Sequence, residues 1–461
     1  MRDRILWLGC LLYAALFTYL GWVKYGAHRN LVDFGIFAQT VASASGCFCN
    51  PIEGSHWAFH FSPVLYPVGV VVALVHSPVT LIALQAMAGA LVAPPVYALV
   101  LRTSNDAGAA WLCAVVTWLY PPLAGVIFGD FHENGFAPAA VAWTFYAFDA
   151  GLTVWTFIGA LVTLAIKEDQ AIFLAIAGTL GAWRFHGTTR GRVAAAIAVI
   201  AALVGIAFFF YIQPHAAAHA AAGWQPERFY AWTVNDAPRI AGGIGARLGF
   251  LLLAFVPLLF LPLRSRMIWL TLAPIAEVLL SRMPTTYTMG THYAGAWIGY
   301  VLVAFAFGVR SMEPRRVRVA LGACIALCAV EFAVADPLHP GLNLRAVQAR
   351  DLMLDRFLET LPADLSVATQ EEAYTHLALF DPYAGLLPES AQQQTSACFA
   401  LVDRDFPDSA RLQEYGDVLM RLVQARRYVL LERAAGIELY RSCASASPAR
   451  AGQPRSARTI R

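Results

Sequence analysis

The sequence has few charged residues. Asp, Glu, Lys and Arg make up 14% of its 461 residues, while hydrophobic residues make up 58% and the mean hydropathy is +0.56. Soluble domains carry about 25% charged residues, so the composition predicts a helical membrane protein with many spans. No basic run with interleaved aromatic residues occurs, so nucleic-acid binding has no support.

The N-terminus lacks the pattern of a cleavable signal peptide. The apolar stretch Ile5–Val23 follows two arginines, is long enough to span a bilayer and has no small-x-small cleavage site. We therefore expect it to be retained as the first membrane helix. The chain also shows no internal repeat of the kind that many transporters contain.

Eleven apolar stretches are candidate spans, and several are shorter than the about 20 residues of a straight crossing. They are Ile5–Val23, Val79–Leu101, Ala109–Phe128, Gly135–Phe148, Gly151–Ile166, Ala171–Phe185, Val193–Ile212, Arg247–Leu263, Met267–Leu280, His292–Gly308 and Val317–Ala335. A twelfth stretch, Phe61–His76, is short and contains two prolines. If it crossed fully, every later basic loop would lie outside, against the positive-inside rule, so we expect it to be re-entrant or interfacial.

This topology predicts where the polar segments lie. The N-terminus is cytoplasmic, the arginine-rich loops face inward, and the loops rich in Asp, Glu and His face outward from the cytoplasmic (inner) membrane. The predicted membrane domain covers residues 1–335 with a first outer loop at 24–62, and the chain from about Asp336 becomes mixed and polar. Residues 336–442 are expected to form a small extracytoplasmic α/β domain, followed by a disordered tail at 443–461.

The α/β domain has recognisable elements. Leu344–Leu361 and Ala410–Gln424 have helical patterns. Four short stretches have strand patterns, namely Leu365–Thr369, Ala397–Val402, Tyr428–Glu432 and Ile437–Tyr440.

Cysteine is scarce, with eight residues that divide between two environments. Cys10, Cys113, Cys324 and Cys328 lie in spans and are expected to be apolar fillers. The other four lie in the outward-facing segments, where disulfides form. We expect a Cys398–Cys443 disulfide, whereas Cys47 and Cys49 look too closely spaced to pair with each other.

The first outer loop is the segment around which the chain is organised. It contains Asp33, Glu53, His56 and His60. Asp33–Ser45 has apolar residues at helical spacing, which predicts a short amphipathic helix on the membrane surface, with Asp33 either as its N-cap or as a chemical group.

Three further polar groups are expected on the outer side. Asp130-Phe131-His132-Glu133-Asn134 follows one span, Lys167-Glu168-Asp169 joins two spans, and Thr291-His292-Tyr293 begins another. Each group taken alone also fits a solvated span end. Together they would place several ionisable side chains at one membrane face, which is typical of a functional site.

These residue types fit one kind of chemistry. A carboxylate can take a proton from an acceptor hydroxyl, Lys167 can neutralise a phosphate, and Asp, Glu and His can hold a divalent cation. A transferase that uses a lipid-phosphate-linked sugar needs these groups at the bilayer interface. Asp403-Arg404-Asp405 also forms a D-x-D pattern, which is common by chance.

Several blocks carry a resemblance to a known family. VDFGIFAQT, FHFSPVLYPV, GDFHENGFAP and AIKEDQAIF, with LPADLSVATQEEAYTHLALF and CFALVDRDFP farther on, resemble an uncharacterised prokaryotic family of polytopic membrane proteins over about Ile5 to Arg441. That family resembles, more distantly, the GT-C glycosyltransferases, which have an essential acidic residue in the first outer loop and a second after a later span. Asp33 and Asp130 match these two positions, although no second acidic residue accompanies Asp33.

The resemblance implies a GT-C-like fold and a polyprenyl-phosphate sugar donor. Asp33 would then be the general base, while Asp130, His132 and Glu133 would orient the acceptor or a divalent cation. Lys167 would bind the donor phosphate with support from Glu168 and Asp169. His56, His60, His292 and Tyr293 would line the site.

Two other functions also fit the sequence. A transporter or lipid flippase would use polar groups near the bilayer midplane, for which Glu277 and Gln85 are the candidates. A non-catalytic membrane scaffold whose outer domain binds a partner would tolerate loss of Asp33, Asp130 and Lys167.

Overall fold

The computed structural model describes residues 4–218, 229–230, 242–338, 344–362, 365–388, 397–407, 409 and 411–442. The chain divides into two compact units. The first contains Met1–Leu20, Trp57–Val68 and Val79–His339, and the second contains Gly21–His56, Gly69–Pro78 and Pro340–Arg461. The predicted Cys398–Cys443 disulfide and the predicted disordered tail at 443–461 lie outside the described residues.

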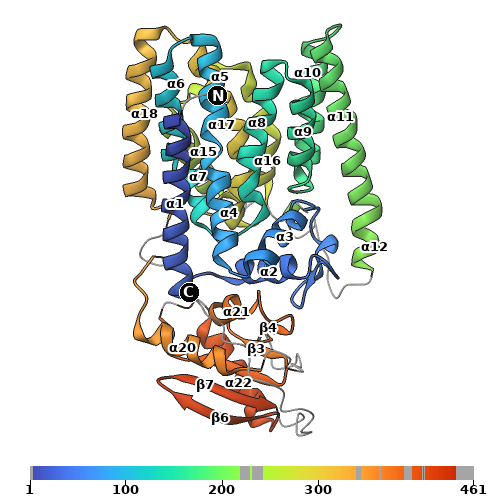
Figure 1. Ribbon diagram of the computed structural model, residues 1–461, viewed down its shortest axis with the longest axis vertical. Helices are drawn as coiled ribbons and strands as arrows, with labels where there is room; N and C mark the ends of the chain where they lie inside the picture. Colours follow the sequence, from blue (N-terminus) through green and yellow to red (C-terminus); the bar gives the residue numbers. More distant parts are fainter. Residues whose placement is uncertain are drawn as a thin grey trace. The chain divides into compact units, whose positions relative to one another are not determined.

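The first unit is helical, and many of its helices run alongside one another (Figure 1). Its α-helices are α1 (Arg4–Gly26), α3 (Leu65–Val75), α4 (Val79–Ala90), α5 (Ala93–Ser104), α6 (Ala107–Leu119), α7 (Pro121–Phe128), α8 (Ala137–Ala150), α9 (Thr153–Leu164), α10 (Asp169–Arg184), α11 (Thr189–Ala207), α12 (Gln213–Ala217), α15 (Ile244–Phe255), α16 (Leu272–Leu280), α17 (Gly295–Arg310) and α18 (Pro314–Ala335). Of these, α1 and α3 extend into the second unit. Short tighter or wider turns are η2 (Glu133–Phe136), η3 (Phe208–Ile212), η5 (Val256–Leu258), η6 (Leu261–Arg264), η7 (Arg266–Thr271), η8 (Pro284–Tyr287) and η9 (His292–Ala294).

Each of the eleven predicted spans contains a helix. Within the described residues, five helices are long and apolar enough to cross a membrane, namely Arg4–Gly26, Val79–Arg102, Thr189–Ala217, His292–Arg310 and Arg315–Ala335. A sixth is counted if Ala107–Leu119 and Pro121–Phe128, bent by 46°, form one broken span. The eleven crossings remain a prediction. The ambiguous stretch Phe61–His76 contains only the 11-residue helix α3, about half the length of a straight span.

The break between α6 and α7 has a local cause. Pro121 and Pro122 follow Tyr120, and proline has no backbone N–H to continue a helix that precedes it. Tyr120 is therefore extended, with ψ at 112°, and α7 starts in a new direction. The helix α7 ends at Phe128, immediately before the polar Asp130 segment.

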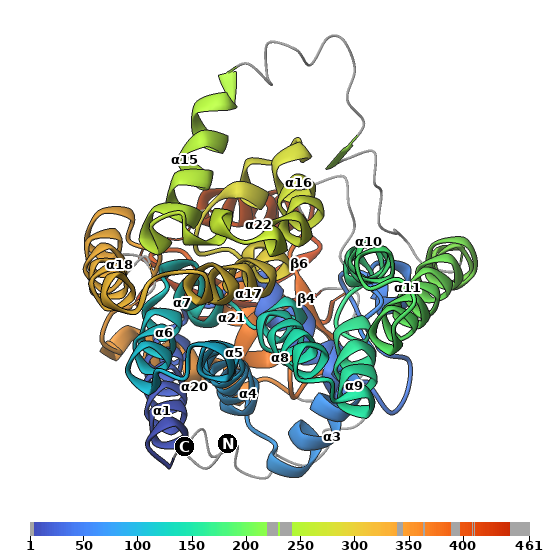
Figure 2. The ribbon, with the colours of Figure 1, turned by 90° about the horizontal axis from the view of Figure 1, so that it is seen from above.

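The helix α17 lies in the interior of the first unit. Nearly all of its residues are buried, and in the end-on view it lies beside α5 and α8 (Figure 2). Because a helix that is apolar on every side must be covered on every side, α17 provides a fixed support for η9 at its N-terminus.

The second unit combines the first loop with the C-terminal region. The loop contains α2 (Val32–Ala42), the strands β1 (Cys49–Asn50) and β2 (Gly54–Ser55), and the turn η1 (His56–Ala58), which ends in the first unit. The C-terminal elements are α20 (Ala349–Thr360), β3 (Val367–Thr369), α21 (Glu371–Leu377), β4 (Ala384–Leu386), β5 (Phe399–Asp403), α22 (Leu412–Gln424), β6 (Tyr428–Ala434) and β7 (Ile437–Ser442).

The five C-terminal strands form one sheet in the order β4-β3-β5-β7-β6. Strand β3 pairs in parallel with β4 and β5, and β7 pairs antiparallel with β5 and β6. A small C-terminal sheet is therefore present, and the region contains both predicted helices and all four predicted strands, while a separate domain at 336–442 stays a prediction. Strand β4 was not predicted.

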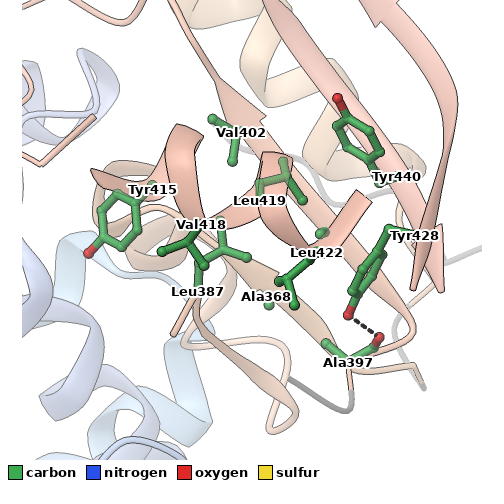
Figure 3. Packing of buried hydrophobic residues seen from close by; sticks show 11 residues of the cluster. Ala368, Leu387, Ala397, Val402, Tyr415, Val418, Leu419, Leu422, Tyr428 and Tyr440 are labelled. Atoms are coloured by element: carbon green, nitrogen blue, oxygen red, sulfur yellow. Dashed lines mark hydrogen bonds between the residues drawn. The ribbon is translucent and has the colours of Figure 1, made fainter. Parts of the chain in front are cut away.

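An apolar cluster joins α22 to this sheet (Figure 3). Val418, Leu419 and Leu422 of α22 are buried against Tyr428 and Tyr440 of the sheet. The Tyr428 hydroxyl donates a hydrogen bond to the Ala397 carbonyl at 2.7 Å, so the tyrosine buries its ring without leaving its polar group unpaired.

The first-loop helix forms, but not as an amphipathic helix on a membrane surface. Residues Phe34 to Val41 of α2 are all buried, and α2 packs against α21. The ring of Tyr374 lies where a Cβ on Gly35 would be, and Gln39 donates to the carbonyls of Asp381 and Ala384 at 3.0 and 2.8 Å. Protein atoms thus cover the apolar face that we expected to lie on lipid.

In the first loop, the structure excludes one of the two alternatives for Asp33, and the prediction for Cys47 and Cys49 is wrong. Asp33 is not the N-cap of α2, because the helix begins at Val32 and Leu31 occupies the cap position. Cys47 and Cys49 form a disulfide with their Cα atoms 5.2 Å apart. Phe48 between them has a φ of 49°, a left-handed conformation that turns the two cysteines toward each other and that spacing alone does not reveal.

Candidate functional site

The Lys167-Glu168-Asp169 turn connects α9 to α10 and is buried, with each residue at most 7% exposed. The loop that precedes α3 closes over it. Val64 N–H donates to the Ala165 carbonyl at 2.8 Å, His60 Nδ1 lies 3.0 Å from Glu168 Oε1, and Phe61 N–H donates to Glu168 Oε2 at 3.0 Å.

The ionisable side chains of this turn and of the adjoining loop shift one another's pKa values. Burial lowers the pKa of His60, but the Glu168 carboxylate outweighs it and raises the pKa above its usual value. Burial raises the pKa of Glu168, but His60 and Lys167 outweigh it and lower the pKa to about 2. Burial also disfavours the Lys167 ammonium, yet the Glu133, Glu168 and Asp169 carboxylates raise its pKa well above the usual range. Lys167 and Glu168 therefore remain charged near neutral pH, and His60 keeps its proton to a higher pH than an ordinary histidine does.

The Asp130 segment is held by a buried glutamine on α4. Gln85 is 2% exposed, and its Nε2 donates to the carbonyls of Val126, Ile127 and Asp130 at 3.2, 3.2 and 3.3 Å. Its Oε1 accepts from the His132 N–H at 3.0 Å. The Gln85 side chain thus supplies hydrogen-bond partners to backbone groups at the end of α7 and holds the backbone of the Asp130 segment that follows.

His292 reaches this segment through a contact between two backbones. A Cβ on Gly125 of α7 would lie 2.7 Å from the Gly290 Cα atom, so only glycine permits this approach, and Gly290 itself has a φ of 84°. The His292 ring then stacks on the His132 ring, with centroids 3.8 Å apart and planes within 7°. Tyr293 lies beside His292, with ring centroids 4.1 Å apart.

Glu133 is a buried carboxylate that lies between His132 and Lys167. It is fully buried, its Oε2 lies 2.9 Å from His132 Nδ1, and its Oε1 lies 4.0 Å from Lys167 Nζ. His132 Nδ1 accepts a hydrogen bond from the Asn134 N–H at 3.3 Å. Within the described part of the chain, neither Glu133 oxygen has a hydrogen-bond partner. A buried carboxylate in this state is a strong binder for a cation or a donor group.

Together these side chains form one polar cluster in the first unit. It consists of His60, Glu133, His132, Lys167, Glu168, Asp169, His292 and Tyr293, with Asp130 half-buried on the segment that carries His132. The structure thus brings together residues from all four predicted polar groups. Asp33 and His56 belong to the second unit, where Asp33 is half-buried in the first turn of α2 and His56 packs edge-on to Phe37 and Phe48.

Sequence reasoning did not assign two residues to this cluster. Gln85 was considered only as a polar residue inside a span, and nothing in the sequence indicates that it holds the Asp130 segment. Glu277 of α16 interacts electrostatically with Asp169 and Lys167, so it belongs with the carboxylates. By contrast, the Asp403-Arg404-Asp405 pattern is part of ion pairs, because Asp403 binds Arg350 and Arg404 binds Glu438.

Comparison with known proteins identifies the family. Residues 28–438 match the family described as predicted membrane protein (DUF2079), and the chain belongs to this family. No curated protein matches the sequence.

Solved structures identify the fold. ArnT from Cupriavidus metallidurans bound to undecaprenyl phosphate is similar with a TM-score of 0.54 at 12% identity, covering 94% of this chain and 98% of ArnT. Its apo state has a TM-score of 0.51 at the same identity and coverage. The Archaeoglobus fulgidus oligosaccharyltransferase tethered to an acceptor peptide is similar at a TM-score of 0.41 and 11% identity, covering 94% of this chain and 74% of the enzyme. The chain is therefore a multi-pass membrane protein with a fold similar to that of ArnT.

Proposed function

We propose that this member of the predicted-membrane-protein family is a GT-C-type glycosyltransferase that transfers a sugar from a polyprenyl-phosphate donor to an extracytoplasmic acceptor. The acceptor hydroxyl attacks the anomeric carbon and loses its proton to a carboxylate. The bond between the sugar and the phosphate breaks, and the polyprenyl phosphate leaves. The enzyme acts at the outer face of the cytoplasmic membrane, where both the lipid tail and a polar acceptor are accessible.

One observation carries the proposal, namely the buried ammonium of Lys167 among three carboxylates in a fold similar to that of ArnT, whose solved structure contains undecaprenyl phosphate. Lys167 is one of only two lysines in the chain. A lysine kept charged away from water is suited to bind the phosphate of a donor whose tail stays in the bilayer. The leaving phosphate needs charge stabilisation and no strong general acid.

A divalent cation fits the cluster as well. Glu133 and Glu168 lie opposite Lys167 and His60, and burial raises the pKa of Asp169 to about 7, so a cation would add the positive charge that a donor phosphate needs. Imidazole and carboxylate ligands suit Mn²⁺ or Zn²⁺, and the unpartnered Glu133 carboxylate fits such an ion. We assign Glu133 and His132, whose Oε2 and Nδ1 atoms lie 2.9 Å apart, to hold it together with the donor phosphate, to which the ion would supply positive charge. Asp130 would orient the acceptor, since among the described residues it forms no three-ligand group with these two.

The remaining roles follow the resemblance. Asp33 is the general base, Glu168 and Asp169 support Lys167, and His56, His60, His292 and Tyr293 line the site. Because Asp33 and His56 lie in the second unit, their roles rest on the motif positions, and experiments must test them separately from the polar cluster.

The test is complementation of a strain that lacks the protein, with mass spectrometry of envelope lipids and glycans. We expect the wild-type protein to restore one sugar-modified product that the deletion strain lacks. Lys167→Met and Asp33→Asn should each reduce it by at least about 100-fold, which is the usual cost of removing a group that stabilises charge in the transition state.

Arg184→Met is the matched control. It removes a positive charge from the other end of α10, about 22 Å from Asp169 at 1.5 Å per residue, and its side chain is exposed. It should restore the product fully. All variants must be present in amounts equal to the wild type. If Lys167→Met and Asp33→Asn then restore the product to the wild-type level, the transferase assignment is refuted and a scaffold is favoured.

A further inference from the structure

A second group of metal-binding side chains lies entirely within the second unit. His28 follows the end of α1, Asp355 is on α20 and His376 is on α21. His28 and His376 are 0% and 4% exposed, and one ligand atom from each of the three residues lies within 4.8 Å of the others. The three residues bring the first loop and the C-terminal domain to one point.

In each imidazole, the ring nitrogen that does not face Asp355 lies within hydrogen-bonding distance of a backbone carbonyl oxygen. His28 Nδ1 lies 3.3 Å from the Glu372 carbonyl oxygen, and His376 Nε2 lies 2.9 Å from that of Tyr25. Because a carbonyl only accepts, these nitrogens carry the proton whenever a ring holds a single proton. This arrangement is the usual support for histidines that bind metals, since it orients the ring and leaves the other nitrogen as a ligand.

The other ring nitrogens, which face Asp355, then carry no proton and can only accept hydrogen bonds. His28 Nε2 and His376 Nδ1 lie 2.9 and 3.4 Å from the same oxygen, Asp355 Oδ1, so lone pairs face lone pairs. Within the described residues, His376 Nδ1 has no hydrogen-bond partner. Protonating both rings would place two cations face to face, because their centroids are only 3.6 Å apart. Protonating one ring would pair it with Asp355 but leave the other nitrogen facing the same oxygen, whereas one metal ion among the three atoms would accept all their lone pairs.

The spacing also fits a metal ion. Ligand atoms at about 2.0 to 2.1 Å from a tetrahedral Zn²⁺ lie about 3.3 to 3.4 Å from one another, close to the observed 2.9 and 3.4 Å. His28 has a φ of 54°, a sparsely populated conformation for a residue other than glycine and one that recurs at ligand sites. Asp355 is partly exposed, with 16% of its side chain accessible, which leaves room for water as a fourth ligand.

We propose that His28, Asp355 and His376 form a structural site for a divalent first-row metal, Zn²⁺ by preference, that ties the first loop to the C-terminal domain. Two imidazoles and one carboxylate are a donor set that Zn²⁺ binds well. This site is separate from the polar cluster in the first unit and does not depend on the proposed transfer reaction.

The test uses the full-length chain in detergent, stripped with a chelator and titrated with Zn²⁺ alone. Because Glu133 is also a candidate cation ligand, the titration is done on the Glu133→Gln protein and the bound metal is counted by elemental mass spectrometry. We expect one tightly bound Zn²⁺ per chain. Further replacement of His376 by Gln should weaken binding by at least about 100-fold, and His186→Gln, at an exposed histidine of the first unit, should leave it unchanged.

A measurement without any change to the three residues guards against a folding defect. In the wild-type protein, Zn²⁺ should slow amide hydrogen exchange in the peptides that cover Tyr25–Arg29 and Glu371–Leu377. The metal site would be overturned if Zn²⁺ left exchange in both peptides unchanged, or if it bound the His376→Gln protein as tightly as the protein with His376 intact. Either result would indicate a proton-sharing cluster. Loss of transfer activity in Lys167→Met would leave this result unaffected, so the two proposals fail independently.

Discussion

Replacement of Gln85 by Leu should destabilise the protein much more than the loss of one ordinary hydrogen bond. Gln85 donates to two carbonyls in the last turn of α7 and to that of Asp130 just after it, and accepts from the His132 N–H. Leucine has a similar volume but no polar atoms, so the change removes these bonds without creating a large cavity.

The magnitude follows from what is left unpaired. The buried His132 N–H loses its acceptor, which costs about 1 to 3 kcal/mol. The three carbonyls lose less, because a carbonyl oxygen can keep another partner, and we add about 1 kcal/mol for them. We therefore expect the free energy of unfolding to fall by about 2 to 4 kcal/mol.

The assay is unfolding of the purified protein by denaturing detergent in mixed micelles. Thr117→Val is the control, since Thr117 is equally buried but donates to Cys113 within its own helix, and its loss should cost only about 1 kcal/mol. If Gln85→Leu costs no more than Thr117→Val, Gln85 does not hold the Asp130 segment, and the account of how the site is built fails.

Two further predictions concern other parts of the molecule. Gly35→Ala should destabilise the second unit by about 1 to 3 kcal/mol, because the ring of Tyr374 lies where the new Cβ would be. We expect faster amide hydrogen exchange in α21, and unchanged exchange would show that α2 and α21 do not pack as described. The His60–Glu168 pair should stabilise the protein in a defined pH range. Because the pKa of His60 is raised above 6.5 and that of Glu168 is lowered from 4.5 to about 2, the contribution is complete between about pH 4.5 and 6.5 and is lost as the pH rises through the raised pKa of His60 or falls toward about 2. The difference in unfolding temperature between wild type and His60→Gln should therefore shrink as the pH rises above 6.5, and a constant difference would contradict the pair.

Much of the polar cluster could be predicted because it follows from span ends. His60, the Asp130 segment, the Lys167 turn and His292 each adjoin an apolar stretch, and the signs of the loop charges sort span ends onto two faces. The C-terminal strands were equally visible, since short β-branched and aromatic runs alternate with polar turns. The three-residue strand β4 has too little pattern to recognise, and its parallel pairing with β3 depends on tertiary structure.

The errors have local physical causes. The Cys47–Cys49 disulfide depends on the left-handed conformation of Phe48, which sequence spacing does not encode. The helix α2 has the apolar pattern of a membrane-surface helix, yet Gly35 and Gln39 adapt it to α21. His28 and His376 are lone histidines 348 positions apart in the sequence, so only folding brings them together.

Direct binding of undecaprenyl phosphate is the measurement that tests the central claim most directly. The wild-type protein in lipid nanodiscs would be titrated with undecaprenyl phosphate in the presence of Mn²⁺, and bound lipid would be counted by native mass spectrometry. We expect one lipid per chain, with binding at least about 10-fold weaker in Lys167→Met, since each about 1.4 kcal/mol of lost interaction is tenfold in affinity, and unchanged in Arg184→Met. Equal binding by Lys167→Met and wild type, or no binding by wild type, would contradict the assignment of the polar cluster as a site for a lipid-linked phosphate.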